Sequence, residues 1–132
     1  MTRDMLRMLD RGYEILWREN DLERALGNLS PDFEWIVPGH PEGELRRGPE
    51  ATIAFFREWT EPWEELHVDW KLEPAGPDRV LAELTMRGRG RGSGAPVEMH
   101  VGQLWTFREG VAASMVLYLD LDEARREAGL DP

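Results

Sequence analysis

One polar side chain stands on an otherwise apolar strand face late in the chain. Residues 97–107 alternate in character, and Gln103 falls on the face that also carries Val97, Met99, Val101, Trp105 and Phe107. A buried amide needs hydrogen-bond partners. Two interpretations stay open: Gln103 binds a ligand, or it belongs to an internal network with Tyr13 or with a strand carbonyl.

The segment 39–50, rich in Gly and Pro, carries the candidate for proton transfer. The imidazole of His40 titrates near neutral pH, and loops commonly host functional residues. Glu42 and Glu44 follow in the same loop. The alternative is a solvated histidine with no role in chemistry.

The other two histidines, His67 and His100, fall on the outward-facing positions of their strands. We interpret them as surface or interface residues. No pair of histidine and carboxylate has a helical or strand spacing suited to a metal ion. We therefore predict no metal site and no cofactor.

Three helices are predicted before most of the sheet. The first has an apolar stripe with helical spacing, formed by Met5, Leu6, Leu9, Tyr13, Leu16 and Trp17. Asn20-Asp21-Leu22-Glu23 predicts the capped start of a short second helix, which ends before Pro31. Pro49 opens a third helix, and Pro62 interrupts it.

The remainder of the chain predicts strands. A first strand covers 33–38 and a loop covers 39–48, and the period changes to two from Glu65 onward. Further strands are expected at 65–73, 80–86, 97–107 and 112–119, with a Gly- and Arg-rich hairpin tip at 87–94. Asp122 is expected to cap a terminal helix that Gly129 closes. This order predicts an α+β domain with helices on one face of a curved antiparallel sheet.

Composition narrows the class of protein. The chain has 132 residues, 41% of them hydrophobic, which suits a single domain over residues 1–132. It has no Cys and no run of transmembrane length, so we expect a cytoplasmic protein without membrane contact. A net charge of -10 repels phosphate backbones, and nucleic acid is not an expected partner despite the basic tip.

Several motifs together carry a resemblance to a known family. These are Tyr13 followed by Asn20-Asp21-Leu22, Arg47-Gly48 before the third helix, and the segment 104–110 before the last strand. In this order they resemble the SnoaL-like group of the nuclear transport factor 2-like superfamily, which also contains ketosteroid isomerase, scytalone dehydratase and limonene epoxide hydrolase. The resemblance covers essentially the whole chain. It implies a cone-shaped α+β barrel with an internal pocket, three N-terminal helices and a short C-terminal helix, on a scaffold that serves many unrelated activities.

The resemblance to ketosteroid isomerase can be tested residue by residue. That enzyme uses a tyrosine and a protonated aspartate as an oxyanion hole and a second aspartate as base. Tyr13 and Gln103 match the two oxyanion-hole positions, and Val37 matches the position of the base. Val37 cannot accept a proton, so this mechanism is not expected. Tyr13 and Gln103 could both donate to one carbonyl oxygen, or Tyr13 could be a core aromatic with a satisfied hydroxyl.

Two functions are predicted as alternatives. The first is binding of a small hydrophobic molecule, carbonyl-bearing or polycyclic, with isomerase, cyclase or hydrolase chemistry by Tyr13, His40 and Gln103. The second is a non-catalytic ligand carrier or a dimeric interaction module. A cavity of roughly 300 Å³ with a titratable group facing it favours the first, and a cavity filled by Trp side chains favours the second. Large apolar residues are expected to line the pocket or the core: Trp17, Phe33, Trp35, Val37, Phe55, Trp59, Met99, Val101, Trp105, Met115 and Leu117.

A homodimer is predicted from the last two strands. Leu104, Val116 and Tyr118 share the parity that points away from the helices. An apolar strip on an open sheet is normally covered. We expect a second copy to cover it through a twofold-symmetric contact, with His100 or Thr106 at the edge.

Overall fold

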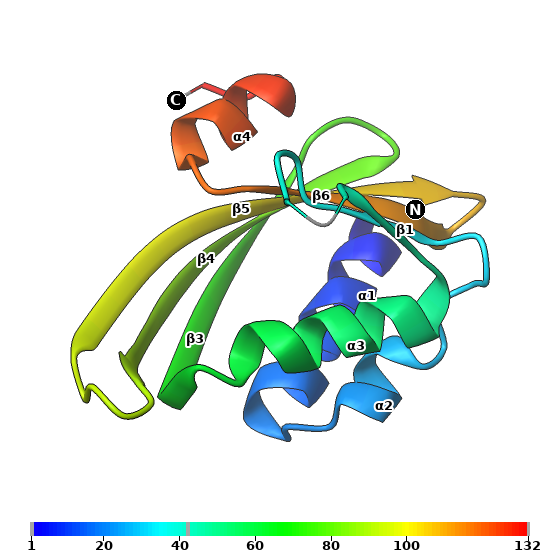
Figure 1. Cartoon of the computed structure of the whole chain (residues 1–132). Coiled ribbons are helices and arrows are strands. Elements are labelled where there is room, and N and C mark those ends of the chain that lie inside the picture. The colour runs from blue at the N-terminus through cyan, green and yellow to red at the C-terminus, as the bar shows by residue number, and fades with distance from the viewer. Residues whose placement is uncertain (1, 42, 132) are drawn as a thin grey trace.

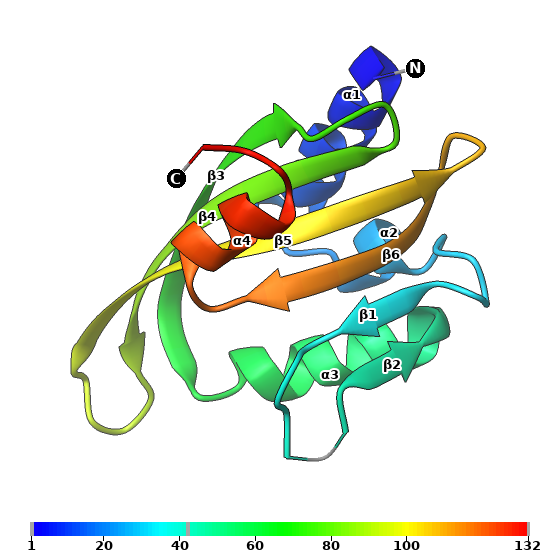
Figure 2. The same cartoon turned by 90° about the horizontal axis from the view of Figure 1, so that it is seen from above.

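The computed structural model describes residues 2–41 and 43–131. Three helices lie against the concave face of a curved six-stranded sheet, and a fourth lies on the opposite face (Figure 1). The strands follow the order β2-β1-β6-β5-β4-β3 across the sheet (Figure 2). They are β1 (Glu34–Ile36), β2 (Leu45–Arg47), β3 (Trp63–Pro74), β4 (Arg79–Gly90), β5 (Pro96–Arg108) and β6 (Val111–Tyr118). The α+β class and the curved sheet are as predicted.

The first helix is longer than one regular α-helix. It comprises α1 (Thr2–Tyr13) and then a π-helical turn, η1 (Glu14–Arg18), in which the Glu19 amide donates to the Glu14 carbonyl. The predicted apolar stripe is confirmed at Met5, Leu9, Tyr13 and Leu16, which are buried. The helix α2 (Leu22–Leu26) follows, and the Asp21 side chain caps it by accepting from the Arg24 amide.

The third helix, α3 (Gly48–Thr60), begins where Pro49 predicted. Gly48 has a φ of 84°, and a Cβ there would lie 3.3 Å from the Pro31 carbonyl oxygen. The predicted loop before this helix is wrong in one part, because residues 45–47 form β2 and pair with β1. The exposed side chains of Leu45 and Arg47 give this strand no apolar alternation that could reveal it.

The sheet is not wholly antiparallel. β1 runs parallel to β6, whereas every other described pairing is antiparallel. The two strands are neighbours in space but far apart in sequence, so no hairpin dictates their relative direction. The register places Trp35 beside Met115 and Met115 beside Trp105 on the inner face. Trp35 and Trp105 of this row line the site, and Met115 between them is buried in the core.

Two of the predicted strands, β3 and β4, have different ends in the structure. β4 continues to Gly90, so the first half of the predicted glycine-rich tip is strand. β3 begins at Trp63, and its ring crosses Gly88, where an added Cβ would lie 2.9 Å from Trp63 Cε3. Gly88 is therefore needed in the strand because an aromatic ring covers its backbone closely.

The C-terminal helix, α4 (Leu121–Glu127), covers the outer face of the sheet (Figure 1). Its cap is Asp120, two residues before the predicted Asp122, and the Asp120 carboxylate accepts from the amides of Asp122 and Glu123. A second small core lies under α4, formed by Ala75, Leu81, Leu104, Ala124 and Ala128, with Tyr118 packed against it. Two residues of the expected dimer strip, Leu104 and Tyr118, thus already pack within the chain.

Among the described residues, no helix combines the length and the apolar character needed to cross a membrane.

Candidate functional site

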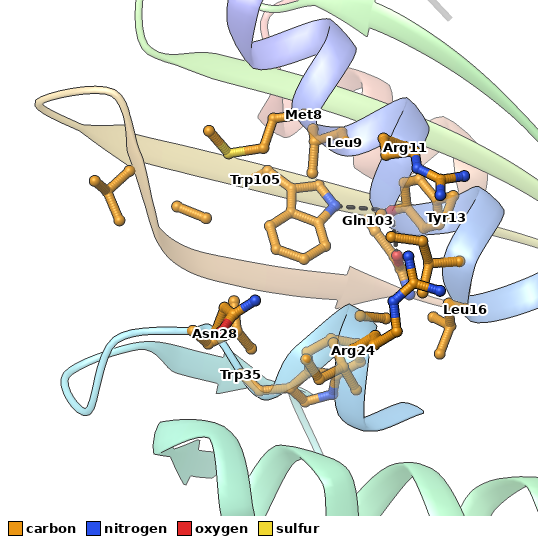
Figure 3. A pocket seen from close by; sticks show the side chains of 17 residues that line it. Met8, Leu9, Arg11, Tyr13, Leu16, Arg24, Asn28, Trp35, Gln103 and Trp105 are labelled. Atoms are coloured by element: carbon orange, nitrogen blue, oxygen red, sulfur yellow. Dashed lines mark hydrogen bonds between the residues drawn. The ribbon is translucent and has the colours of Figure 1, made fainter. Parts of the chain in front are cut away.

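A cavity of about 330 Å³ opens between the N-terminal helices and the hairpin end of β5 and β6 (Figure 3). Met8, Leu9 and Gly12 of α1 form one side, and Ala25 and Leu29 face them from α2 and its end. Trp35 and Trp105 supply the floor from the inner face of the sheet. Most of the lining is apolar, as in sites that bind small organic molecules.

Three side chains form a hydrogen-bonded chain at the deep end of the cavity. The Tyr13 hydroxyl donates to Gln103 Oε1, and Trp105 Nε1 donates to the Tyr13 hydroxyl oxygen at 2.8 Å (Figure 3). All three residues are buried. An indole N–H can only donate, so the Tyr13 oxygen is the acceptor and its proton goes to Gln103. This fixes the Gln103 amide with its oxygen toward Tyr13.

Tyr13 stays a neutral phenol. Burial raises the pKa of Tyr13 well above its ordinary value, while the hydrogen bond from Trp105 opposes that rise. Its ring also stacks on Trp70, with the centroids 5.7 Å apart. Because the hydroxyl already donates once and accepts once, Tyr13 acts on Gln103 and is not a free donor for a ligand.

Gln103 and Trp35 separate the large cavity from a second, much smaller one. The second cavity, of about 30 Å³, lies between α3 and the sheet, and Phe55, Phe56 and Trp59 line it from α3. Only Gln103 and Trp35 line both cavities among the described residues. The Gln103 amide nitrogen remains available for a ligand, because its oxygen is the atom that Tyr13 engages.

Ion pairs stand at the edge of the large cavity. Arg11 and Arg24 both line it, and each places Nη1 2.7 Å from a carboxylate oxygen of Glu19. Hydrogen bonds to Glu14 and then Glu19 raise the pKa of Arg11, and those from Arg24 and Arg11 lower the pKa of Glu19. Among the described residues that line the cavity there is no carboxylate and no imidazole.

The structure does not bring His40 to this cavity. Its Nδ1 lies 3.4 Å from Arg46 Nη2, and its ring meets the Phe55 ring edge-on at 5.6 Å. Val37, at the expected base position, is partly buried, and its amide donates to the Glu44 carbonyl. Neither His40 nor Val37 lines either cavity. Glu42 lies outside the described residues.

The two remaining histidines are exposed, where their strand parity predicted. His67 Nε2 lies 3.4 Å from Asp69, and His100 Nε2 lies 3.2 Å from Glu98.

The predicted lining residues divide between the two cavities and the core. Trp35 and Trp105 line the large cavity. Six line the small one, namely Trp35, Phe55, Trp59, Met99, Val101 and Leu117. Four others, Trp17, Phe33, Val37 and Met115, belong to the apolar core or its margin and line neither cavity.

Sequence reasoning missed the helical half of the cavity. Met8, Gly12 and Ile15 lie beside the core stripe of the first helix, Ala25 comes from α2, and Asn28 comes from the turn after α2. A signal was present in Gly12, a residue that lowers helix stability and leaves a notch. A Cβ at Gly12 would meet nothing within 4 Å, so this notch is part of the open space.

The chain belongs to the SnoaL-like domain family, whose profile matches residues 9–115. This match includes Tyr13, Trp35, Gln103 and Trp105. Among curated proteins no match was found.

Solved structures with the same fold share little sequence with this chain. A nuclear transport factor 2-like protein of unknown function from Burkholderia pseudomallei is 22% identical, with a TM-score of 0.75, and the alignment covers 93% of this chain and 95% of that one. A candidate SnoaL-like polyketide cyclase from Jannaschia sp. is 19% identical, with a TM-score of 0.78 and coverage of 98% and 94%. TerC, co-crystallised with polyporic acid, is 19% identical, with a TM-score of 0.74 and coverage of 96% and 98%. These likenesses establish the nuclear transport factor 2-like cone.

Proposed function

We propose that this protein binds a small, largely apolar molecule that carries an acceptor oxygen, such as a carbonyl, in the cavity of about 330 Å³. The observation that carries the proposal is the hydrogen-bonded chain of Trp105, Tyr13 and Gln103 at the deep end of an apolar space. Because Tyr13 donates to the Gln103 oxygen, the Gln103 amide nitrogen is the group that can donate to a ligand. An amide N–H₂ can only donate, so it selects a ligand with an acceptor.

Binding without acid–base chemistry is the function that this lining favours. General-base catalysis needs a carboxylate, an imidazole or a comparable group within hydrogen-bond reach of the substrate proton. The described lining offers neither carboxylate nor imidazole, and Tyr13 is held as a neutral phenol. We therefore propose a ligand carrier or sensor in preference to an isomerase or a cyclase that depends on a base.

A matched pair of ligands tests the proposal. The ketone 2-acetylnaphthalene and its hydrocarbon analogue 2-ethylnaphthalene have nearly the same shape and differ in the acceptor oxygen. Isothermal titration calorimetry should show saturable binding of both and tighter binding of the ketone. Gln103→Leu should reduce the preference for the ketone by about two- to tenfold, the range expected for one hydrogen bond.

A control variant separates the cavity from the rest of the surface. Leu119 is exposed and lines only the small cavity. Leu119→Phe should therefore leave binding of both compounds unchanged. Absence of saturable binding of either naphthalene to the wild-type protein would contradict the proposed function.

A further inference from the structure

Two arginines line the large cavity from facing helices. Arg11 belongs to α1 and Arg24 to α2, and they are the only charged residues of the described lining. Their side chains are 51% and 54% exposed, so a molecule that enters the cavity can reach both. Figure 3 shows the Arg24 side chain extending from α2 toward Arg11, so that the two guanidinium groups point toward one another. We call these two residues the arginine pair.

A carboxylate already lies between the two members of the arginine pair. Glu19 accepts from Nη1 of Arg11 with Oε2 and from Nη1 of Arg24 with Oε1, each at 2.7 Å. Two guanidinium groups repel each other, and the charge of Glu19 offsets that repulsion. The pair is therefore held in an arrangement in which both members bind one carboxylate.

The arginine pair keeps further donors. A guanidinium group has five N–H donors, two on each Nη and one on Nε. The hydrogen bonds of both side chains to described residues, including that of Arg11 to Glu14, use Nη1 alone. Nε and Nη2 of each arginine can therefore bind a second acidic group while Glu19 stays in place.

The charge of the lining is opposite to that of the molecule. The chain has a net charge of -10, which repels anions in general. Neither Glu14 nor Glu19 lines the cavity, so the formal charges that face a ligand within the described lining are both positive. A preference of this protein for an anionic ligand would therefore have a local origin.

We propose that the arginine pair binds a carboxylate of the ligand. The inference rests on the proposed function and narrows it: the ligand is an aromatic or polycyclic carboxylic acid whose apolar body occupies the cavity and whose carboxylate lies at the arginine pair. A ligand that presents an ammonium group there meets two cations and is rejected.

Two ligands of nearly equal shape test the charge preference. 3-(2-Naphthyl)propanoate is an anion at neutral pH, and 3-(2-naphthyl)propanamide is neutral and keeps the acceptor oxygen. Calorimetry on the wild-type protein should show about two- to tenfold tighter binding of the propanoate. 2-Acetylnaphthalene should compete with the propanoate, because both occupy the same cavity.

Arg24→Gln and the matched control Arg57→Gln locate the effect. Arg57 is 59% exposed and pairs with Glu23, but it lines neither cavity. Each variant removes one exposed positive charge from an ion pair. Arg24→Gln should lower the preference for the propanoate over the propanamide by about two- to fivefold, and Arg57→Gln should leave it unchanged.

A measurement on the wild-type protein covers a failure of either variant to fold. An increase in NaCl from about 50 mM to about 500 mM screens exposed charges, so it should weaken binding of the propanoate and leave that of the propanamide unchanged.

The outcomes distinguish the two proposals. If 2-acetylnaphthalene binds but the propanoate binds no tighter than the propanamide, the inference is overturned and the proposed function stands. The same holds if Arg24→Gln and Arg57→Gln change the preference alike, or if 2-acetylnaphthalene binds without competing with the propanoate. If none of the naphthyl compounds binds the wild type, the proposed function fails and the inference falls with it.

Discussion

The Tyr13 hydroxyl makes two hydrogen bonds, so the buried side chains of Trp105, Tyr13 and Gln103 depend on one another. It accepts from Trp105 and donates to Gln103, so its removal leaves two groups unpaired in an apolar environment. An unpaired buried group costs more than a hydrogen bond contributes. The parity of the strand predicted Gln103 as the polar member of the inner face. The sequence limited the hydrogen-bond partner of Gln103 to Tyr13 or a strand carbonyl. It could not decide between them, because the residue that lies opposite Gln103 depends on how the first helix packs against the sheet.

A double-mutant cycle measures this interdependence. Tyr13→Phe should lower the free energy of unfolding by about 1–3 kcal/mol, because Gln103 and Trp105 lose their partner. Gln103→Leu should cost a similar amount, and the double variant should cost less than the sum of the two. Urea-induced unfolding of the four proteins gives the values. Strictly additive losses would show that the two side chains are not coupled in solution.

The two tyrosines should titrate differently at high pH. Burial raises the pKa of Tyr13 strongly. The pKa of the partly exposed Tyr118 is also raised, first by burial and then by the charges of Glu127 and Glu123. An unfolded tyrosine ionises near about pH 10, so the folded state keeps the Tyr13 proton where the unfolded state loses it. Stability from this group is complete below about pH 10 and declines as the pH rises further.

Absorbance and unfolding experiments together check this expectation. Tyrosinate absorbance should rise first from Tyr118, and Tyr118→Phe should remove that early phase. Tyr13 should ionise only as the chain unfolds, and Tyr13→Phe should flatten the decline of unfolding free energy above about pH 10. A Tyr13 phase that precedes unfolding would show that the phenol is solvated.

The helices determine how much open space the protein has. At Gly12 of α1 a side chain would enter the cavity without contact, whereas at Gly102 of β5 a Cβ would lie 2.5 Å from the Ala124 Cβ of α4. The periodicity of the first helix predicted its buried stripe correctly. It did not predict the π-helical turn or the cavity beside that stripe, because both depend on how α1 and α2 sit against the β5–β6 hairpin.

Substitution of Gly12 should separate stability from binding. Gly12→Ala should raise the free energy of unfolding by about 0.5–1 kcal/mol, the usual gain for replacing a helical glycine. Gly12→Leu should keep most of that gain and fill the cavity, so binding of 2-acetylnaphthalene should be lost. Thermal unfolding and calorimetry measure the two effects.

Gly102→Ala is the matched control, because the same added methyl group meets a backbone-anchored neighbour there. It should destabilise the protein by displacing α4 while leaving the cavity open. Unchanged ketone binding in Gly12→Leu would place the ligand outside the cavity.

At the scale of the molecule, the order of helices and strands was enough to predict the cone, because the long helices and strands have a clear period and the family resemblance spans the chain. The position of α4 was not predicted. Nothing in residues 121–127 indicates which sheet face they cover, and the small side chains of Gly102 and Ala124 matter only once the two elements are in contact.

An apolar row crosses the outer face of the sheet, and α4 covers only part of it. The strand registers place Leu45, Ile36, Val116, Leu104 and Leu81 side by side on β2, β1, β6, β5 and β4. Leu104 and Leu81 lie under α4, whereas Leu45 is 43% exposed and Ile36 and Val116 are partly exposed. The predicted dimer strip is thereby shifted toward β1 and β2.

We propose that a second copy of the chain covers the exposed part of this row through a twofold-symmetric contact, since apolar strips on an open sheet are normally covered. Multi-angle light scattering at micromolar concentration and physiological salt should give the mass of a dimer. Val116→Arg should give a monomer, because the interface would have to bury two unpaired charges. Val97→Arg adds the same charge at an exposed position on β5 outside the row, and it should remain dimeric. A monomeric wild-type protein under these conditions would refute the dimer, and dissociation by both variants alike would trace the effect to net charge and not to the row.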